Sequence, residues 1–219
     1  MCNRSGWGGE GTDLMDMSGR ETPSELAGAY GRVRATTERL ASVLSAEDQT
    51  VQTMPDVSPT KWHRAHVTWF FETFILGEYA AGYDAFDDAY AYVFNSYYEA
   101  VGARHPRTER GLLSRPGIDE IARYRHFVDE AMDALVRDPS QPGLAELITL
   151  GLHHEQQHQE LLLMDIKHVL SRNPLQPVYL AGGPEPAGIA PPKAGWLEHE
   201  GGPVEVGHWR GQPGRPGFH

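Results

Sequence analysis

The sequence predicts an all-α protein: a four-helix bundle with one long crossover loop, followed by an incomplete, irregular β-rich tail. Three observations support this fold class. Four segments carry apolar residues at helical spacing. Capping residues, proline and glycine mark the ends of these segments. Proline and glycine then crowd residues 175–219, where a helix cannot form.

The first two helices follow a leader without hydrophobic periodicity. Residues 1–21 are rich in Gly, Asp and Ser, which predicts a disordered leader. Thr22-Pro23-Ser24-Glu25 is a capping box that opens a helix expected to end near Leu44. Ser58-Pro59 repeats the start signal for a second helix, Thr60 to Leu76. One face of that segment predicts a buried helix, and it carries Trp62, His66, Trp69, Phe70 and Thr73.

A long segment, residues 77–117, separates these helices from the next two and shows little helical periodicity. A loop of this length inside a compact domain is usually functional or poorly ordered. A third helix is predicted over Ile118 to Val136. The fourth runs from Pro142 to about Leu170 and is closed by Asn173-Pro174. We therefore assign residues 22–174 to the bundle.

The tail, residues 175–219, reads as a linker and the start of a second domain. Trp196-Leu197 and Val204 to Val206 are its candidate strands. The segment is too short to bury a core of its own.

Composition excludes several functional classes. The 219 residues carry a formal net charge of −11, which disfavours nucleic acid and anionic membrane as partners. No apolar run reaches membrane-spanning length and no signal peptide is evident, so we expect a cytoplasmic protein. Cys2 is the only cysteine, which argues against a disulfide framework and a thiolate-rich metal site.

The strongest functional motif lies in the fourth helix, within the stretch LGLHHEQQHQELLLMDIKH. His154 and His158 stand four residues apart, so both imidazoles project from one helix face and can bind one metal ion. His66 of the second helix is the natural third ligand. His63, on the opposite flank of that helix from Trp62 and Phe70, is the competing choice. A mostly apolar stripe at helical spacing predicts that the pair points into the bundle; it comprises Leu147, Leu150, His154, His158, Leu161 and Asp165.

The crossover loop concentrates aromatic and basic side chains. Tyr97 and Tyr98 with Arg104, Arg107 and Arg110 are typical of a pocket wall for an anionic ligand, because guanidinium groups match carboxylates. An exposed basic loop that offsets an acidic protein explains the same residues. The sequence pattern leaves both interpretations open.

Three stretches together resemble the iron-dependent sulfoxide synthases of ergothioneine biosynthesis. They are SPTKWHRAHVTWFFETF (Ser58 to Phe74), FNSYYEAVGARHPRTERGLLSRP (Phe94 to Pro116) and HHEQQHQELLLMD (His153 to Asp165). The resemblance implies a DinB-like bundle followed by a domain similar to formylglycine-generating enzyme, a sulfatase-modifying-factor-like fold. It also implies an Fe(2+)-dependent oxidoreductase that uses O2 to join hercynine to cysteine or γ-glutamylcysteine, yielding a sulfoxide.

Matched motif by motif, the resemblance implies a role for six residues. His66, His154 and His158 would bind iron(II), leaving three coordination positions for the two substrates and dioxygen. Gln157 would contact hercynine, and Arg107 and Arg110 would receive the carboxylates of the thiol substrate. The second domain of such enzymes continues well beyond the tail seen here and supplies an active-site tyrosine. We therefore expect a truncated chain with impaired activity, and a complementing chain as a candidate partner.

Three other functions fit parts of the sequence. A zinc metallopeptidase of the His-Glu-x-x-His type would use Glu155 as general base, although Leu161 stands where the extended motif needs glycine. A DinB-like, divalent-metal-dependent thiol transferase would use the same three histidines without a second domain. A non-catalytic metal-binding fragment is the third alternative.

Overall fold

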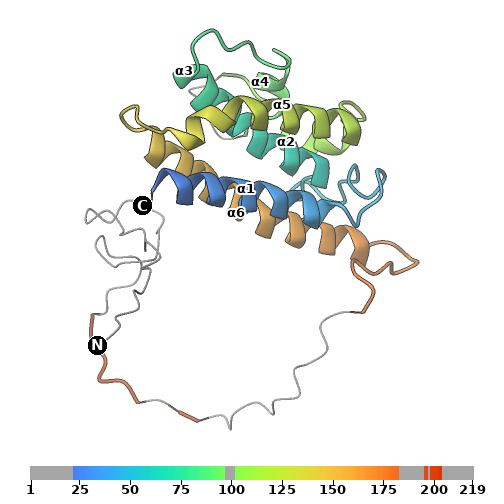
Figure 1. Cartoon of the computed structure of the whole chain (residues 1–219). Coiled ribbons are helices and arrows are strands. Elements are labelled where there is room, and N and C mark those ends of the chain that lie inside the picture. Colours follow the sequence, from blue (N-terminus) through green and yellow to red (C-terminus); the bar gives the residue numbers. More distant parts are fainter. Residues whose placement is uncertain (1–21, 97–101, 183–194, 197, 204–219) are drawn as a thin grey trace, which may run out of the picture.

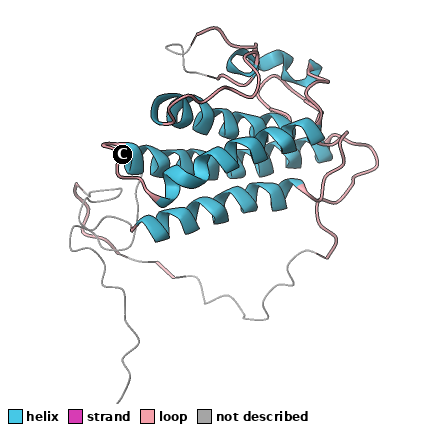
Figure 2. Cartoon of the chain, turned by 45° about the horizontal axis from the view of Figure 1, so that its top comes forward, coloured by secondary structure: helices cyan, strands magenta, loops and turns pink. Residues whose placement is uncertain are grey.

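Four long helices form the protein in the computed structural model, which describes residues 22–96, 102–182, 195–196 and 198–203. Two of them, α1 and α2, each pack against both α5 and α6 (Figure 1). No strand occurs within the described residues (Figure 2), so the predicted all-α class is confirmed for this part of the chain. The four helices are α1 (Pro23–Ala41), α2 (Thr60–Phe71), α5 (Ile118–Arg137) and α6 (Leu144–Ser171).

The starts of α1 and α6 are set by residues next to them in the sequence, whereas the start of α2 differs from the predicted cap. The Thr22 hydroxyl accepts the Glu25 backbone N–H at 3.3 Å, and the Glu25 carboxylate accepts the Thr22 N–H at 2.9 Å, so the predicted capping box is present. Gly143 precedes α6 with φ +80°, a conformation that favours glycine. The predicted cap at Ser58 is wrong, because Pro59 is the N-cap of α2 and no side chain caps it. The Ser58 hydroxyl instead accepts a hydrogen bond from Arg110.

Helix α2 is the central helix, since all of its residues are buried. It runs on through a π-helical stretch, η1 (Glu72–Leu76), into the short α3 (Gly77–Tyr79), so the helical segment extends three residues beyond the predicted end. Glu72 in the π-helical stretch is buried and accepts hydrogen bonds from the hydroxyls of Tyr83 and Tyr124. Stretches of π-helix inside α-helices often occur near functional sites.

The crossover segment is more regular than predicted. It contains α4 (Tyr90–Val93) and a 3-10 helix, η3 (Arg107–Leu112). Hydrogen bonds tie it to the bundle: Trp62 Nε1 donates to the Val93 carbonyl at 3.2 Å, and Gln52 Nε2 donates to the Arg107 carbonyl at 2.8 Å. Local periodicity missed these short helices because their order comes from contacts with α2 and the segment before it. Tyr97 and Tyr98 lie outside the described residues.

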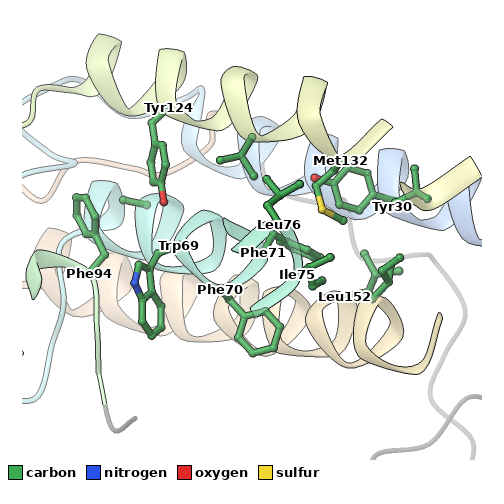
Figure 3. Close-up of a cluster of buried hydrophobic side chains, with 14 of the residues drawn as sticks. Tyr30, Trp69, Phe70, Phe71, Ile75, Leu76, Phe94, Tyr124, Met132 and Leu152 are labelled. Atoms are coloured by element: carbon green, nitrogen blue, oxygen red, sulfur yellow. The ribbon is translucent and has the colours of Figure 1, made fainter. Parts of the chain in front are cut away.

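A cluster of aromatic and aliphatic side chains fills the space between the helices (Figure 3). Tyr124 and Met132 reach from α5 towards α2, whose Trp69 and Phe71 are fully buried. Burying one such side chain stabilises the fold by about 1.5–3 kcal/mol. The cluster therefore fixes α2, the helix that carries His66, against its neighbours.

The predicted β-rich tail is not confirmed. Trp196 is 100 % exposed and belongs to no strand, and the described residues after α6 contain no regular element. Leu197, Val204 to Val206 and the predicted leader, residues 1–21, lie outside the described residues. Within the part of the chain that the structure describes, no helix is both long and apolar enough to cross a membrane.

Candidate metal centre

Three histidines from two helices converge between α2 and α6. His66 of α2 and His154 and His158 of α6 each offer a ring nitrogen, and these three atoms lie within 4.8 Å of one another. Among the described residues, this is the one group of three or more His, Cys, Asp or Glu side chains close enough to hold a metal ion. The predicted trio therefore comes together in space.

The stripe of α6 that the sequence predicts to point inward is only partly buried. Leu150 of that stripe is 44 % exposed, while His154 and His158 are half-buried. The most deeply buried face is rotated from this stripe and shares Asp165 with it; it includes Leu144, Ile148, Gly151, Leu152, Glu155, Leu162, Asp165, Ile166 and Val169. The histidines consequently lie at the margin of the bundle, where one side of the site faces outward.

His66 is held rigidly by its neighbours. Its Nδ1 lies 2.6 Å from the Phe94 carbonyl oxygen, which can only accept, so Nδ1 carries the proton and Nε2 keeps a lone pair. The rings of Trp62 and Trp69 stack on the imidazole at centroid distances of 4.6 and 5.4 Å. Because Trp62 lies one turn before His66 and Trp69 about one turn after it, the ring is held between two indoles.

Burial keeps the three imidazoles neutral. It lowers the pKa of His154 to about 4. Burial and then the neighbouring His154 lower the pKa of His66 well below its ordinary value, and burial and then His66 do the same for His158. Neutral imidazole is the form that binds a metal, so the site is ready for one at pH 7.

Glu155 points away from the histidines into a buried ionic cluster. Its side chain is 0 % exposed, and its carboxylate accepts from Arg34 at 2.8 Å, Arg125 at 3.0 Å and Thr37 at 2.6 Å. Burial alone would raise the pKa of Glu155, but Arg34 and Arg125 together lower it to about 2. The carboxylate is thus a permanent anion that links α6 to α1 and α5.

This environment removes Glu155 from any chemistry at the metal. A general base must reach the water or substrate whose proton it takes. Glu155 instead lies in the core with its oxygens occupied by two guanidinium groups and a hydroxyl. The geometry disfavours a peptidase, in which the residue after the first histidine activates water.

The predicted substrate-binding residues occupy different environments. Gln157 is exposed on α6 between His154 and His158. Arg110 of η3 is 4 % exposed, with Cζ 3.3 Å from the centroid of the Trp62 ring and Nη1 donating to Ser58 Oγ at 2.9 Å. Arg110 is therefore buried against Trp62, next to His66, and is not part of an exposed basic loop.

The other two arginines of the loop lie further out. Arg107 is half-buried and donates to the Asp56 carbonyl. Arg104 is exposed and donates to the Ser96 carbonyl at 2.7 Å. The exposed-loop interpretation thus fits Arg104, whereas Arg110 is buried.

Sequence reasoning missed the role of His63. We placed it on the opposite flank of the helix from Trp62 and Phe70, yet its Nδ1 lies 2.9 Å from Nδ1 of His158. Asp165 contacts the other nitrogen of His63. The spacing held a signal, because Asp165 follows His158 by two helical turns and His63 precedes His66 by almost one.

No protein-family model matches the chain. A search of curated proteins likewise found no significant match.

Proposed function

We propose that this protein is a non-haem iron(II) enzyme that uses dioxygen to join hercynine to cysteine or γ-glutamylcysteine and to oxidise the sulfur to a sulfoxide. The convergence of His66 with His154 and His158 carries the proposal. The stretches that resemble sulfoxide synthases contribute α2, the 3-10 helix with Arg110, and the turns of α6 that carry His154 and His158 to this one site. The proposal includes a DinB-like bundle and a cytoplasmic location, which rest on the sequence alone.

The residues present fit a metal ion. Imidazole nitrogens suit iron, zinc, copper and nickel. The three nitrogens lie within 4.8 Å of one another, and they would draw closer together around an ion bound about 2 Å from each. Nδ1 of His154 is buried without a hydrogen-bond partner among the described residues, and buried polar atoms are normally satisfied. A bound cation would satisfy this imidazole. When bound, iron(II) would supply the electron transfer and oxygen chemistry that amino-acid side chains lack.

The surrounding side chains suit two polar substrates. Arg110 is a buried cation whose charge helps to lower the pKa of both His66 and His158, after burial and the neighbouring histidines, so its field reaches the site. A fixed guanidinium in this position favours a substrate carboxylate. The exposed amide of Gln157 stands on the outward side of the same turns and is free to hydrogen-bond an imidazole-containing substrate.

The proposed reaction balances without a further reductant. A C–H bond of hercynine and the S–H bond of the thiol are lost, and one C–S bond forms, which releases two electrons and two protons. Oxidation of the sulfur to a sulfoxide releases two more electrons. Dioxygen accepts all four electrons, with one oxygen atom entering the sulfoxide and the other leaving as water.

The test is a reaction with stoichiometric protein, loaded with iron(II) under anaerobic conditions and then mixed with hercynine, cysteine and oxygenated buffer. Mass spectrometry should detect the sulfoxide, and parallel reactions with γ-glutamylcysteine would identify the preferred thiol. His66→Ala should abolish both product and iron binding. His168→Ala is the matched control, because His168 also lies on α6 but contacts Thr53, at 2.7 Å, rather than the site.

Three outcomes separate the candidate functions. Sulfoxide that requires iron, oxygen and His66 supports the proposal. A thiol adduct formed without oxygen would instead identify a divalent-metal thiol transferase. Iron-loaded protein that forms no sulfoxide even at stoichiometric amounts contradicts the proposal for this chain.

A further inference from the structure

A second histidine of α2 joins the candidate metal centre to a buried carboxylate. His63 Nδ1 lies 2.9 Å from Nδ1 of His158, and His63 Nε2 lies 3.0 Å from Asp165 Oδ2. The same oxygen accepts the Ser58 backbone N–H at 2.8 Å. His63 and Asp165 are each 3 % exposed. These contacts form a continuous buried chain from the start of α2 to His158.

The carboxylate sets the direction of every hydrogen bond in this chain. A carboxylate has no proton to donate, so His63 Nε2 must donate to Asp165. A neutral imidazole carries only one N–H, which leaves His63 Nδ1 as an acceptor. His158 Nδ1 must therefore be the donor between the two rings. The lone pair of His158 is then on Nε2, the nitrogen that remains for a metal.

We propose that His63 and Asp165 are positioning residues that fix the tautomer and orientation of His158 as a metal ligand. The inference rests on the metal site of the proposed function and adds residues that the resemblance did not assign. Metal-binding histidines commonly donate their other N–H to a carboxylate or carbonyl group, which orients the ring and strengthens it as a donor. Here a second histidine stands between the ligand and the carboxylate.

The same contacts decide between His63 and His66 as the third ligand. Both ring nitrogens of His63 are engaged, Nδ1 by His158 and Nε2 by Asp165. His66 uses Nδ1 for the Phe94 carbonyl and retains Nε2. His66 therefore has a nitrogen to give to the metal, whereas His63 serves His158.

The first measurement needs neither a metal nor a substitution. Long-range proton–nitrogen NMR of the metal-free protein reports which ring nitrogen of each histidine carries the proton. We expect His158 protonated on Nδ1 and His63 protonated on Nε2. His158 protonated on Nε2 would overturn the proposed chain of hydrogen bonds, whether or not the protein binds iron.

The second measurement is iron(II) affinity, determined by anaerobic competition with a chromophoric chelator. His63→Leu keeps an apolar side chain of similar size but cannot accept from His158, so we expect binding to weaken about 10- to 100-fold. His63→Gln retains an amide oxygen to accept and an amide nitrogen to donate, and should restore most of the affinity. His168→Leu, on the same helix, should leave the affinity unchanged.

The coupling between the two positioning residues supplies a further control. In a His63→Leu background the link is already broken, so adding Asp165→Leu should weaken iron binding no further. Thermal unfolding of each metal-free variant checks that the bundle is intact, and electron paramagnetic resonance of the iron–nitrosyl adduct reports the ligand set. Wild-type affinity and spectrum in His63→Leu would overturn the positioning role. A wild-type chain that binds no iron would contradict the proposed function, while the NMR result would still test this inference.

Discussion

Replacing Glu155 with glutamine should destabilise the fold rather than remove a catalytic base. Three buried arginines pair with three carboxylates, of which Glu155 is fully buried and the other two are partly exposed, so the charges balance: Arg34, Arg64 and Arg125 against Glu38, Asp129 and Glu155. Glutamine leaves one positive charge uncompensated in the core and turns an amide N–H₂ towards a guanidinium group. Breaking a buried pair in this way costs about 3–5 kcal/mol. This is a large fraction of the stability of a typical domain.

Urea denaturation followed by circular dichroism measures this effect. We expect a lower midpoint for Glu155→Gln with little change in slope, because the surface exposed on unfolding stays the same. Glu160→Gln, an exposed substitution on the same helix, should stay within about 0.5 kcal/mol of wild type. A Glu155→Gln protein as stable as wild type would refute the structural role assigned to this carboxylate.

The pH dependence of stability provides a second measurement on Glu155. The pKa of this carboxyl is lowered in the folded state from 4.5 to about 2, so its contribution is fully present above pH 4.5 and is lost as the pH falls towards 2. A shift of this size corresponds to roughly 3 kcal/mol. Acid titrations should show this loss in the wild-type protein. Glu155→Gln should lack it, and equal acid sensitivity in both proteins would contradict the assignment.

Three further substitutions test separate features of the fold. Gly151→Ala places a Cβ 2.7 Å from the Phe71 ring. Although alanine favours a helix more than glycine does, we expect urea denaturation to show a loss of about 1–3 kcal/mol in stability, and iron binding to weaken. Unchanged stability and affinity would show that α2 and α6 can move apart without cost. Thr22→Ala removes the capping box of α1. Thermal unfolding should show a loss of about 1 kcal/mol in stability, with no change in metal affinity. An unchanged melting temperature would show that the cap is dispensable. Tyr124→Phe removes a 2.5 Å hydrogen bond to the buried Glu72. Thermal unfolding should show a loss of about 1–3 kcal/mol in stability. Unchanged stability would indicate that water replaces the hydroxyl.

Local sequence signals predicted the parts of the structure that depend on neighbouring residues. The capping box at Thr22, the four long helices and the pairing of His154 with His158 all follow from spacing within one segment. The choice of His66 as third ligand needed only the assumption that two buried helix faces meet. These features depend on helical geometry, which repeats every 3.6 residues whatever the surroundings.

The tertiary structure alone decided which side of α6 is buried. His154 and Glu155 are adjacent in sequence, and the pattern of apolar residues placed the histidines inward. The structure buries Glu155 more deeply than either histidine of α6, because Arg34 on α1 and Arg125 on α5 compensate its charge. Such compensation comes from residues far away in the chain and leaves no trace in local spacing.

The sequence by itself thus determined the helices and the three histidines that could hold a metal ion. Only the folded molecule revealed that His63 and Asp165 support His158 and that Arg110 packs on Trp62 beside the site. The physical reason is the range of the interactions: hydrogen-bond periodicity within a helix acts over a few residues. Charge compensation and ring stacking act between segments that folding brings together.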